Sequence, residues 1–298
     1  MIRAENLTMK YDQFVALKDL NCTIPEGCVY GLVGSNGAGK STFMRLAAGI
    51  YRPYAGTVTV GGVKVYDSPE AKARIAFVPD ELFFLPRATM SRMAMLYASN
   101  YTKFDKARFQ ELTAAFGLNP EAQISTFSKG MRRQAAIILA LSTRPEYILF
   151  DETFDGLDPV MRNLVRKVLY NDVEERGATA VISSHSLRDL EDTCDQLALL
   201  HKGGLIFESD VENLKTSLFK VQIAFSEAFD KNVLDSIEVL DWSKRGSVAN
   251  AIVRGDREAV RAMLAAKSPL LLDILPLTLE EIFIYEMEAL GYAFHDVL

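Results

Sequence analysis

The chain has 298 residues, of which 49% are hydrophobic and 24% are charged, proportions typical of a globular protein with a substantial core. Its formal net charge of −6 argues against an extended nucleic-acid surface, and its three cysteines follow no metal-binding spacing. The longest uninterrupted apolar run, Ala135 to Leu141, is too short to cross a bilayer, so we expect another chain to supply any membrane-spanning part.

The N-terminal part of the chain predicts strands followed by a glycine-rich loop. The first thirty residues alternate apolar and polar positions, as strands do. The continuous apolar run CVYGLV, residues 28–33, predicts a buried strand. The loop GSNGAGKST follows and leads into a helical run that Gly49 closes. Residues 57–65 then predict two short strands around Gly61 and Gly62, which is a hairpin signal.

A helical block interrupts the strands in the middle of the chain. RIAFVP, residues 74–79, predicts a buried strand, and a helical pattern rich in Ala, Met and Leu runs from Thr89 to Leu141. Buried strands return with YILFDE, residues 147–152, and TAVISSH, residues 179–185. Residues 197–209 predict a hairpin. The pattern therefore indicates an α/β core that resumes after a helical insertion.

The character of the sequence changes after about Ser209. KVQIAF, DSIEVLDW, VANAIVRG and LLLDILP predict strands, and DREAVRAMLAAK predicts an amphipathic helix with an acidic start. The last helix opens with the capping-box pattern Thr278-x-x-Glu281. We therefore expect a main domain over residues 1–209 and a small α+β accessory domain over residues 210–298.

The loop between the first buried strand and the first helix fits the P-loop pattern. Its glycines allow backbone N–H groups to surround phosphates, and the helix adds the positive end of its dipole. We expect Lys40 to reach the β- and γ-phosphates and Ser41 to place its hydroxyl on Mg²⁺. The predicted phosphate-binding residues are Gly34, Ser35, Asn36, Gly37, Ala38, Gly39, Lys40, Ser41 and Thr42.

Two carboxylates end the buried strand YILFDE. Asp151 can hold Mg²⁺ through water, as the corresponding acid does in P-loop enzymes. Glu152 can polarise an attacking water as general base. Two solvated carboxylates at a strand end are common, but the P-loop upstream favours catalysis.

The order of these motifs resembles that of the nucleotide-binding subunit of ATP-binding-cassette (ABC) transporters over about residues 1–210. The resemblance implies a P-loop NTPase (RecA-like) core with an antiparallel β-subdomain and a helical subdomain over about residues 82–144. It implies that Tyr11 stacks on adenine and that His185, in the sequence SSH, contacts the γ-phosphate. It also implies that Gly156-Leu157-Asp158 crosses between two subunits.

The stretch STFSKGM occupies the place of the family's signature, commonly Leu-Ser-Gly-Gly-Gln. Ser128 and Gly130 match the signature, which in the family closes over the ATP held by a second subunit. Phe127, Lys129 and Met131 depart from it. Lys129 either strengthens a phosphate contact or points to solvent, and Met131 lacks the hydrogen bonding of the glutamine.

A second departure follows the strand RIAFVP. The family usually has Gln or Glu where this chain has Asp80, and the shorter Asp80 still offers Mg²⁺ an oxygen ligand. The next apolar residues, Phe83 to Pro86, either receive a helix of a membrane partner or pack as an ordinary loop.

The resemblance implies an ATP-binding and ATP-hydrolysing subunit, with ATP and Mg²⁺ as cofactors, that drives a separate multi-span permease. It places this subunit at the cytoplasmic face of the cell membrane, paired head to tail with a second ATPase subunit in a homodimer or a heterodimer. The C-terminal appendage, with its Leu-Glu-Glu-Ile-Phe helix, is similar to those on exporter ATPases for drugs, antimicrobial peptides or lipids.

Two alternatives remain at this point. One is a soluble ABC ATPase that is not coupled to transport, although the long coiled coil of repair types and the second cassette of translation types are missing from the sequence. The other is a nucleotide-gated switch with low turnover, which Asp80, Lys129 and Met131 keep open.

Overall fold

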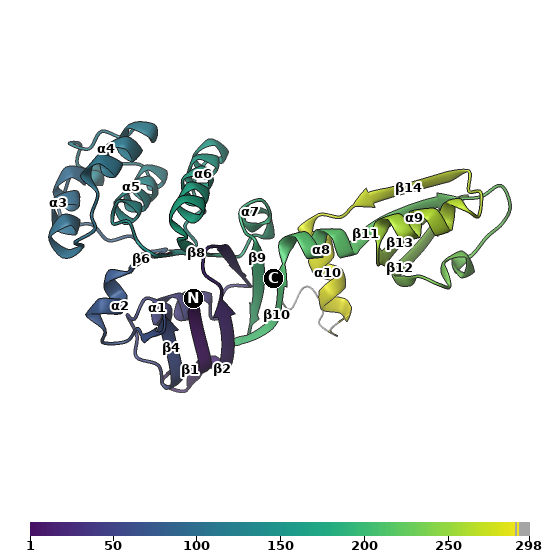
Figure 1. Cartoon of the computed structure of the whole chain (residues 1–298), viewed down its shortest axis with the longest axis horizontal. Coiled ribbons are helices and arrows are strands. Elements are labelled where there is room, and N and C mark those ends of the chain that lie inside the picture. The colour runs from purple at the N-terminus through teal and green to yellow at the C-terminus, as the bar shows by residue number, and fades with distance from the viewer. Residues whose placement is uncertain (290, 292–298) are drawn as a thin grey trace. The chain divides into compact units, whose positions relative to one another are not determined.

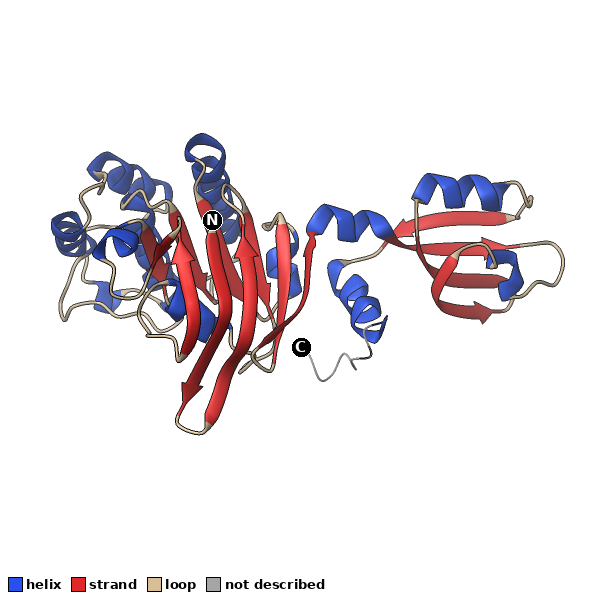
Figure 2. Cartoon of the chain, turned by 60° about the horizontal axis from the view of Figure 1, so that its bottom comes forward, coloured by secondary structure: helices blue, strands red, loops and turns tan. Residues whose placement is uncertain are grey.

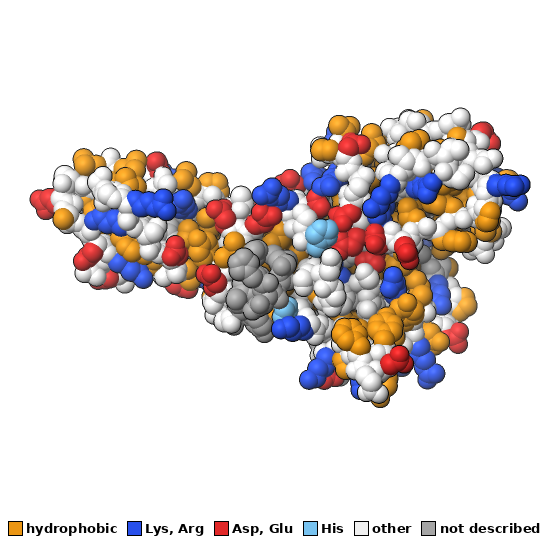
Figure 3. All heavy atoms as spheres, turned by 180° about the vertical axis from the view of Figure 1, so that it is seen from behind, with side chains coloured by type: hydrophobic (Ala, Val, Ile, Leu, Met, Phe, Trp, Pro, Cys, Tyr) orange, Lys and Arg blue, Asp and Glu red, His pale blue; other side chains and the backbone are white. Residues whose placement is uncertain are grey.

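The computed structural model describes residues 1–289 and 291 (Figure 1). The chain divides into two compact units, with the division between Glu208 and Ser209. Within the described residues, no helix combines the length and the apolar character that a membrane span needs. The surface shown in Figure 3 mixes acidic and basic side chains over both units.

A six-stranded sheet forms the centre of the first unit. In sheet order its strands are β10 (Gly204–Asp210), β9 (Gln196–His201), β3 (Val29–Val33), β8 (Thr179–Ser184), β7 (Tyr147–Asp151) and β6 (Ile75–Val78). The pairs from β9 to β6 are parallel, and β3, β7 and β8 are buried along their whole length. The apolar runs predicted as buried strands are therefore confirmed, and their carboxyl ends share one edge of the sheet.

A second, antiparallel sheet packs in the same unit, and its long strands are clear in Figure 2. Its order is β2 (Phe14–Ile24), β1 (Ile2–Tyr11), β4 (Ala55–Val60) and β5 (Val63–Lys64). One core cluster joins this sheet to α1 (Lys40–Ala47) and to the parallel sheet, with Leu17, Phe43 and Leu149 among its members. The short helix α2 (Pro69–Ala73) precedes β6. This core holds α1, which follows the P-loop, against both sheets.

The predicted helical block is present as α3 (Met90–Asn100), α4 (Lys106–Ala115), η1 (Ile124–Thr126) and α5 (Lys129–Ser142). The three α-helices begin after Thr89, Asp105 and Ser128, whose side chains each accept a bond from a backbone N–H of the first turn. Helix α5 is buried from Arg133 to Ser142, so it anchors the block.

The longest helix among the described residues, α6 (Pro159–Arg176), covers residues for which the sequence analysis made no prediction. Its boundaries nevertheless follow ordinary rules. Asp158 caps its first turn, Pro159 is its first residue, and Gly177 follows it with a φ of 64°. The short helix α7 (Leu187–Glu191) lies between β8 and β9.

The second unit holds an antiparallel sheet in the order β12 (Glu238–Arg245), β13 (Val248–Arg254), β11 (Leu218–Ala224) and β14 (Leu271–Pro276). Its other elements are α8 (Val211–Ser217), η2 (Lys231–Leu234), α9 (Arg257–Ala265) and α10 (Leu279–Ala289). Val260 and Leu264 of α9 belong to the core on one face of this sheet. The predicted capping box is confirmed: Glu281 Oε2 accepts from the Thr278 amide at 2.8 Å, and Thr278 Oγ1 accepts from the Glu281 amide at 3.3 Å.

Candidate nucleotide site

The loops that follow parallel strands carry most of the predicted site residues. The loop Gly34–Gly39 follows β3, Asp80 follows β6, Glu152 follows β7, and His185 follows β8. Because parallel strands end at one edge, residues far apart in the sequence are brought together here. Ligands of open α/β sheets bind at this edge.

The glycine-rich loop has a backbone that only glycine adopts comfortably. Gly34 and Gly39 have φ values of 155° and 110°. A Cβ added to Gly34 would lie 2.3 Å from the Leu200 carbonyl oxygen, and one added to Gly39 would lie 2.6 Å from Leu17 Cδ2. Helix α1 begins directly afterwards at Lys40, so its first N–H groups are available to an anion.

Lys40 is almost fully buried and is held at three points. Its ammonium donates to the carbonyl oxygens of Gly34 at 2.6 Å and Ser35 at 3.3 Å. It also lies 3.1 Å from Glu152 Oε1. The ammonium group of Lys40 is therefore held against the loop and forms an ion pair with Glu152, the predicted base.

Asp151 is completely buried at the end of β7. Its Oδ1 accepts from Ser41 Oγ at 3.0 Å and from Ser183 Oγ at 2.7 Å. Its Oδ2 is buried and has no hydrogen-bond partner among the described residues. Burial raises the pKa of Asp151, and the bonds from Ser183 and Ser41 oppose that increase. A buried carboxylate oxygen without a partner, next to a hydroxyl, forms an oxygen donor set that suits Mg²⁺.

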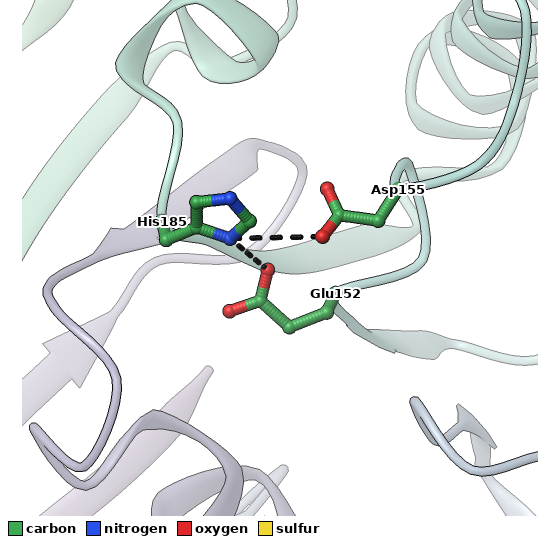
Figure 4. A group of neighbouring side chains, drawn as sticks. All are labelled: Glu152, Asp155 and His185. Carbon is green, nitrogen blue, oxygen red and sulfur yellow. Dashed lines mark hydrogen bonds and ion pairs between the residues drawn. The ribbon is translucent and has the colours of Figure 1, made fainter.

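Glu152 and His185 lie in contact, and Asp155 joins them (Figure 4). His185 Nδ1 lies 3.1 Å from Glu152 Oε2 and 3.6 Å from Asp155 Oδ2. The amide of Glu152 donates to Ser183 Oγ at 3.1 Å, and Glu152 has a φ of 49°, which is uncommon for a side chain of this size. Burial, followed by the charge of Glu152, raises the pKa of Asp155, and His185 opposes this.

Asp80 is positioned by an arginine that the sequence analysis did not single out. Arg133 of α5 is only 2% exposed. Its guanidinium donates to Asp80 Oδ1 at 3.0 Å and to the carbonyl oxygens of Asp80 and Pro79 at 3.0 and 3.3 Å. The helical block is thus tied by charge-assisted bonds to the loop after β6.

A cleft of about 240 Å³ opens over the P-loop. Tyr11 and Phe14, at the turn between β1 and β2, form its aromatic wall, and Tyr11 also packs edge-on against Tyr51 at 6.0 Å. Phe14 was not predicted, although an aromatic residue three positions after Tyr11 is visible in the sequence. The lining residues are Tyr11, Phe14, Ala16, Asn36, Gly37, Gly39, Lys40, Ser41, Thr42, Asp80 and Glu152.

Ser128 and Gly130 are not among the residues that line this cleft. Ser128 caps α5 by accepting from the Met131 amide at 3.2 Å. Gly130 lies in the first turn of α5, where an added Cβ would meet the Gly156 carbonyl oxygen at 3.1 Å. Within one chain, the signature stretch therefore lies next to the loop after Glu152. Ser128 and Gly130 do not line the cleft over the P-loop of their own chain.

The comparisons with known proteins all point to one family. A family profile described as ABC transporter matches residues 17–155. The ABC transporter ATP-binding protein YtrB of Bacillus subtilis is 30% identical over 285 residues, covering 95% of this chain and 97% of that protein. The ABC transporter ATP-binding protein NatA of the same organism is 34% identical over 210 residues, covering 68% of this chain and 85% of NatA.

The solved structure of an ATP-binding subunit of an ABC transporter aligns with a TM-score of 0.67 and 26% identity, covering 72% of this chain and 92% of that one. This chain belongs to the family of ABC transporter ATP-binding proteins. It is the ATP-binding subunit of an ABC transporter and an ATPase, with the P-loop fold expected from its motifs.

Proposed function

We propose that this subunit hydrolyses Mg·ATP in the cleft over Gly34–Thr42 and drives a separate multi-span permease, in the direction of export. The observation that carries the proposal is the convergence of Lys40, Ser41, Asp151 and Glu152, through contacts of 3.0–3.1 Å. The direction rests on relatives such as the linearmycin resistance ATP-binding protein LnrL of Bacillus subtilis. LnrL is 32% identical over 212 residues, covering 69% of this chain and 68% of LnrL.

In this proposal the loop residues and Lys40 bind the phosphates. The backbone N–H groups of Gly37 and Gly39, and those at the start of α1, surround the phosphates. Lys40 now donates to two loop carbonyl oxygens and pairs with Glu152. A γ-phosphate would compete with Glu152 for this ammonium, because both are anions within its reach.

Mg²⁺ would be held by Ser41, Asp151 and Asp80. The unpartnered Oδ2 of Asp151 supports this assignment, because a buried carboxylate oxygen normally has a partner. When bound, the ion would neutralise charge on the β- and γ-phosphates. Arg133 fixes the Asp80 carboxylate, so Asp80 reaches the cleft from a constrained position.

Glu152 is the proposed general base, and His185 contacts the γ-phosphate. Once phosphate oxygens pair with the Lys40 ammonium in place of Glu152, the Glu152 carboxylate can accept a proton from an attacking water. His185 holds the other carboxylate oxygen at 3.1 Å, which limits the orientations that Glu152 can adopt.

Ser128 and Gly130 are proposed to close over the ATP of a second ATPase subunit, paired head to tail. Their position outside the cleft of their own chain supports this, since a signature that served its own P-loop would line it. Tyr11 would stack on adenine. The subunit would act at the cytoplasmic face of the membrane, where its permease lies.

The test measures Mg²⁺-dependent ATP binding and hydrolysis by the purified chain. Lys40→Ala should lose ATP affinity, whereas Lys167→Ala, which removes an exposed lysine of α6, should bind normally. Equal ATP binding by wild type and Lys40→Ala would falsify the proposed site. Affinity capture from membranes then tests transport: a multi-span partner supports it, and recovery of ribosomes or DNA contradicts it.

A further inference from the structure

A cluster of three potential metal ligands lies beside the magnesium residues. Glu152, Asp155 and His185 each offer one ligand atom, and these atoms all lie within 4.8 Å of one another (Figure 4). We propose that they bind a transition-metal ion of the Zn²⁺ type, at a site distinct from the one formed by Ser41 and Asp151.

The distances fit the size of a tetrahedral zinc site. Zn²⁺ lies about 2.0–2.2 Å from nitrogen and carboxylate ligands, so neighbouring ligand atoms are roughly 3.4 Å apart. His185 Nδ1 lies 3.1 Å from Glu152 Oε2 and 3.6 Å from Asp155 Oδ2. Two edges of the tetrahedron are thus close to their final length, and the two carboxylate oxygens that form the third edge lie within 4.8 Å of each other.

The donor types select the metal. An imidazole nitrogen with two carboxylate oxygens is a set that Zn²⁺ accepts, with a water in the fourth position. Mg²⁺ prefers six oxygen ligands, so an imidazole at this position disfavours it. His185 is 51% exposed, which leaves the cluster open to an ion and to its water.

The surroundings orient Glu152 as a ligand. Its Oε1 is held by Lys40 and its amide by Ser183, which leaves Oε2 directed at His185. Such outer contacts fix the ligating atom of a carboxylate in metal sites. Lys40 offsets one of the two carboxylate charges, so the cluster retains a negative charge that a cation compensates.

A bound ion would occupy both Glu152 and His185 and so block hydrolysis. This consequence rests on the proposed function, because it assumes that these two residues act on ATP. The binding itself does not depend on that assumption, so the two can be tested apart.

The first experiment titrates Zn²⁺ into the full chain without nucleotide, in excess Mg²⁺, by calorimetry. We expect one strong site per chain, which Asp155→Asn weakens about tenfold or more, as loss of even an outer-shell partner costs 10–100-fold. Asp192→Asn removes an exposed carboxylate of the same type and should leave the affinity unchanged. Thermal melting confirms that both variants are folded.

Cobalt provides a second readout, because Co²⁺ in a tetrahedral site absorbs visible light and Zn²⁺ does not. The wild type and Asp192→Asn should show this band at the same Co²⁺ concentration, and Asp155→Asn should need about tenfold more Co²⁺ or more to show it. Equal Zn²⁺ affinity in wild type and Asp155→Asn, or no strong site in the wild type, overturns the proposal.

Inhibition is measured last. Zn²⁺ should inhibit the ATPase of the wild type, and a concentration about tenfold higher should be needed for Asp155→Asn. If Zn²⁺ binds through Asp155 and hydrolysis continues, the metal site stands and the roles of Glu152 and His185 in hydrolysis are refuted.

Discussion

Lys40 Nζ and Glu152 Oε1 lie 3.1 Å apart, so the proposed phosphate-binding cation and the proposed base form an ion pair with each other. Both side chains are largely buried, at 5% and 13% exposure. The Coulomb attraction between the two charges is stronger in such surroundings than at the surface, because water screens it less. Under the proposed function, ATP binding and activation of the base would be coupled, because a phosphate that pairs with Lys40 would also release Glu152.

Glu152→Gln should separate these two roles. The amide cannot accept the proton of water, so the rate of ATP hydrolysis should fall by about 10²–10⁴-fold. ATP affinity should stay equal or rise, because glutamine competes less well for Lys40. Single-turnover hydrolysis and equilibrium ATP binding measure the two effects. Glu174→Gln, an exposed position of α6, is the control, and hydrolysis at wild-type rate in Glu152→Gln would contradict the role of base.

Asp151→Asn should change how stability depends on pH. Burial raises the pKa of Asp151 above 3.8, so the folded protein retains a proton that the unfolded chain has already lost. As pH rises from that value through the folded pKa, this group makes unfolding progressively easier. The melting temperature of Asp151→Asn relative to wild type should therefore increase over this window. A difference that stays constant with pH would refute the link, and Asp192→Asn provides the comparison at an exposed carboxyl.

The sequence predicted the local features of this site better than its long-range contacts. The P-loop, the buried strands and the capping box of Thr278 depend on neighbours in the chain, and all three were recognised. The contact of Arg133 with Asp80 joins residues 53 positions apart, and a lysine or arginine in a helix is usually on its surface. No local pattern signals such a pairing. The closeness of Asp155 to His185 likewise arises only when β7 and β8 are aligned in the sheet.

Arg133→Met should destabilise the first unit more than Asp80→Asn does. The methionine fills much of the same space but leaves the Pro79 and Asp80 carbonyl oxygens without their donor. Loss of these charge-assisted bonds should lower the free energy of unfolding by about 2–3 kcal/mol. Asp80→Asn leaves the buried Arg133 guanidinium its two carbonyl acceptors and offers it an amide oxygen in place of the carboxylate, so this variant should cost less, about 1 kcal/mol.

Urea unfolding of the two variants and of the double variant measures this coupling. If Asp80→Asn costs as much as Arg133→Met, the carboxylate and not the backbone carbonyls carries the interaction. Asp80→Asn should in addition raise the Mg²⁺ concentration that hydrolysis requires. Arg133→Met should raise it only by changing the position of Asp80.

Two alanine substitutions in the P-loop distinguish backbone strain from steric exclusion. Gly37 and Gly39 both have positive φ values, 84° and 110°, so alanine is strained at either position. At Gly37 an added Cβ meets nothing within 4 Å, whereas at Gly39 it lies 2.6 Å from Leu17 Cδ2 and 2.9 Å from the Ala16 carbonyl oxygen. Gly39→Ala should therefore cost about 1–3 kcal/mol more than Gly37→Ala, because the loop must shift against β2.

The same shift should affect nucleotide binding, because helix α1 begins at the residue after Gly39. A displaced helix start would move the Lys40 ammonium away from the Gly34 carbonyl oxygen, to which it now donates at 2.6 Å. Gly39→Ala should thus lose ATP affinity in addition to stability, and Gly37→Ala should lose less of both. Denaturant unfolding and ATP titration of the pair give the comparison. Equal losses in the two variants would show that φ strain alone explains the glycines, and that contact with β2 does not position the loop.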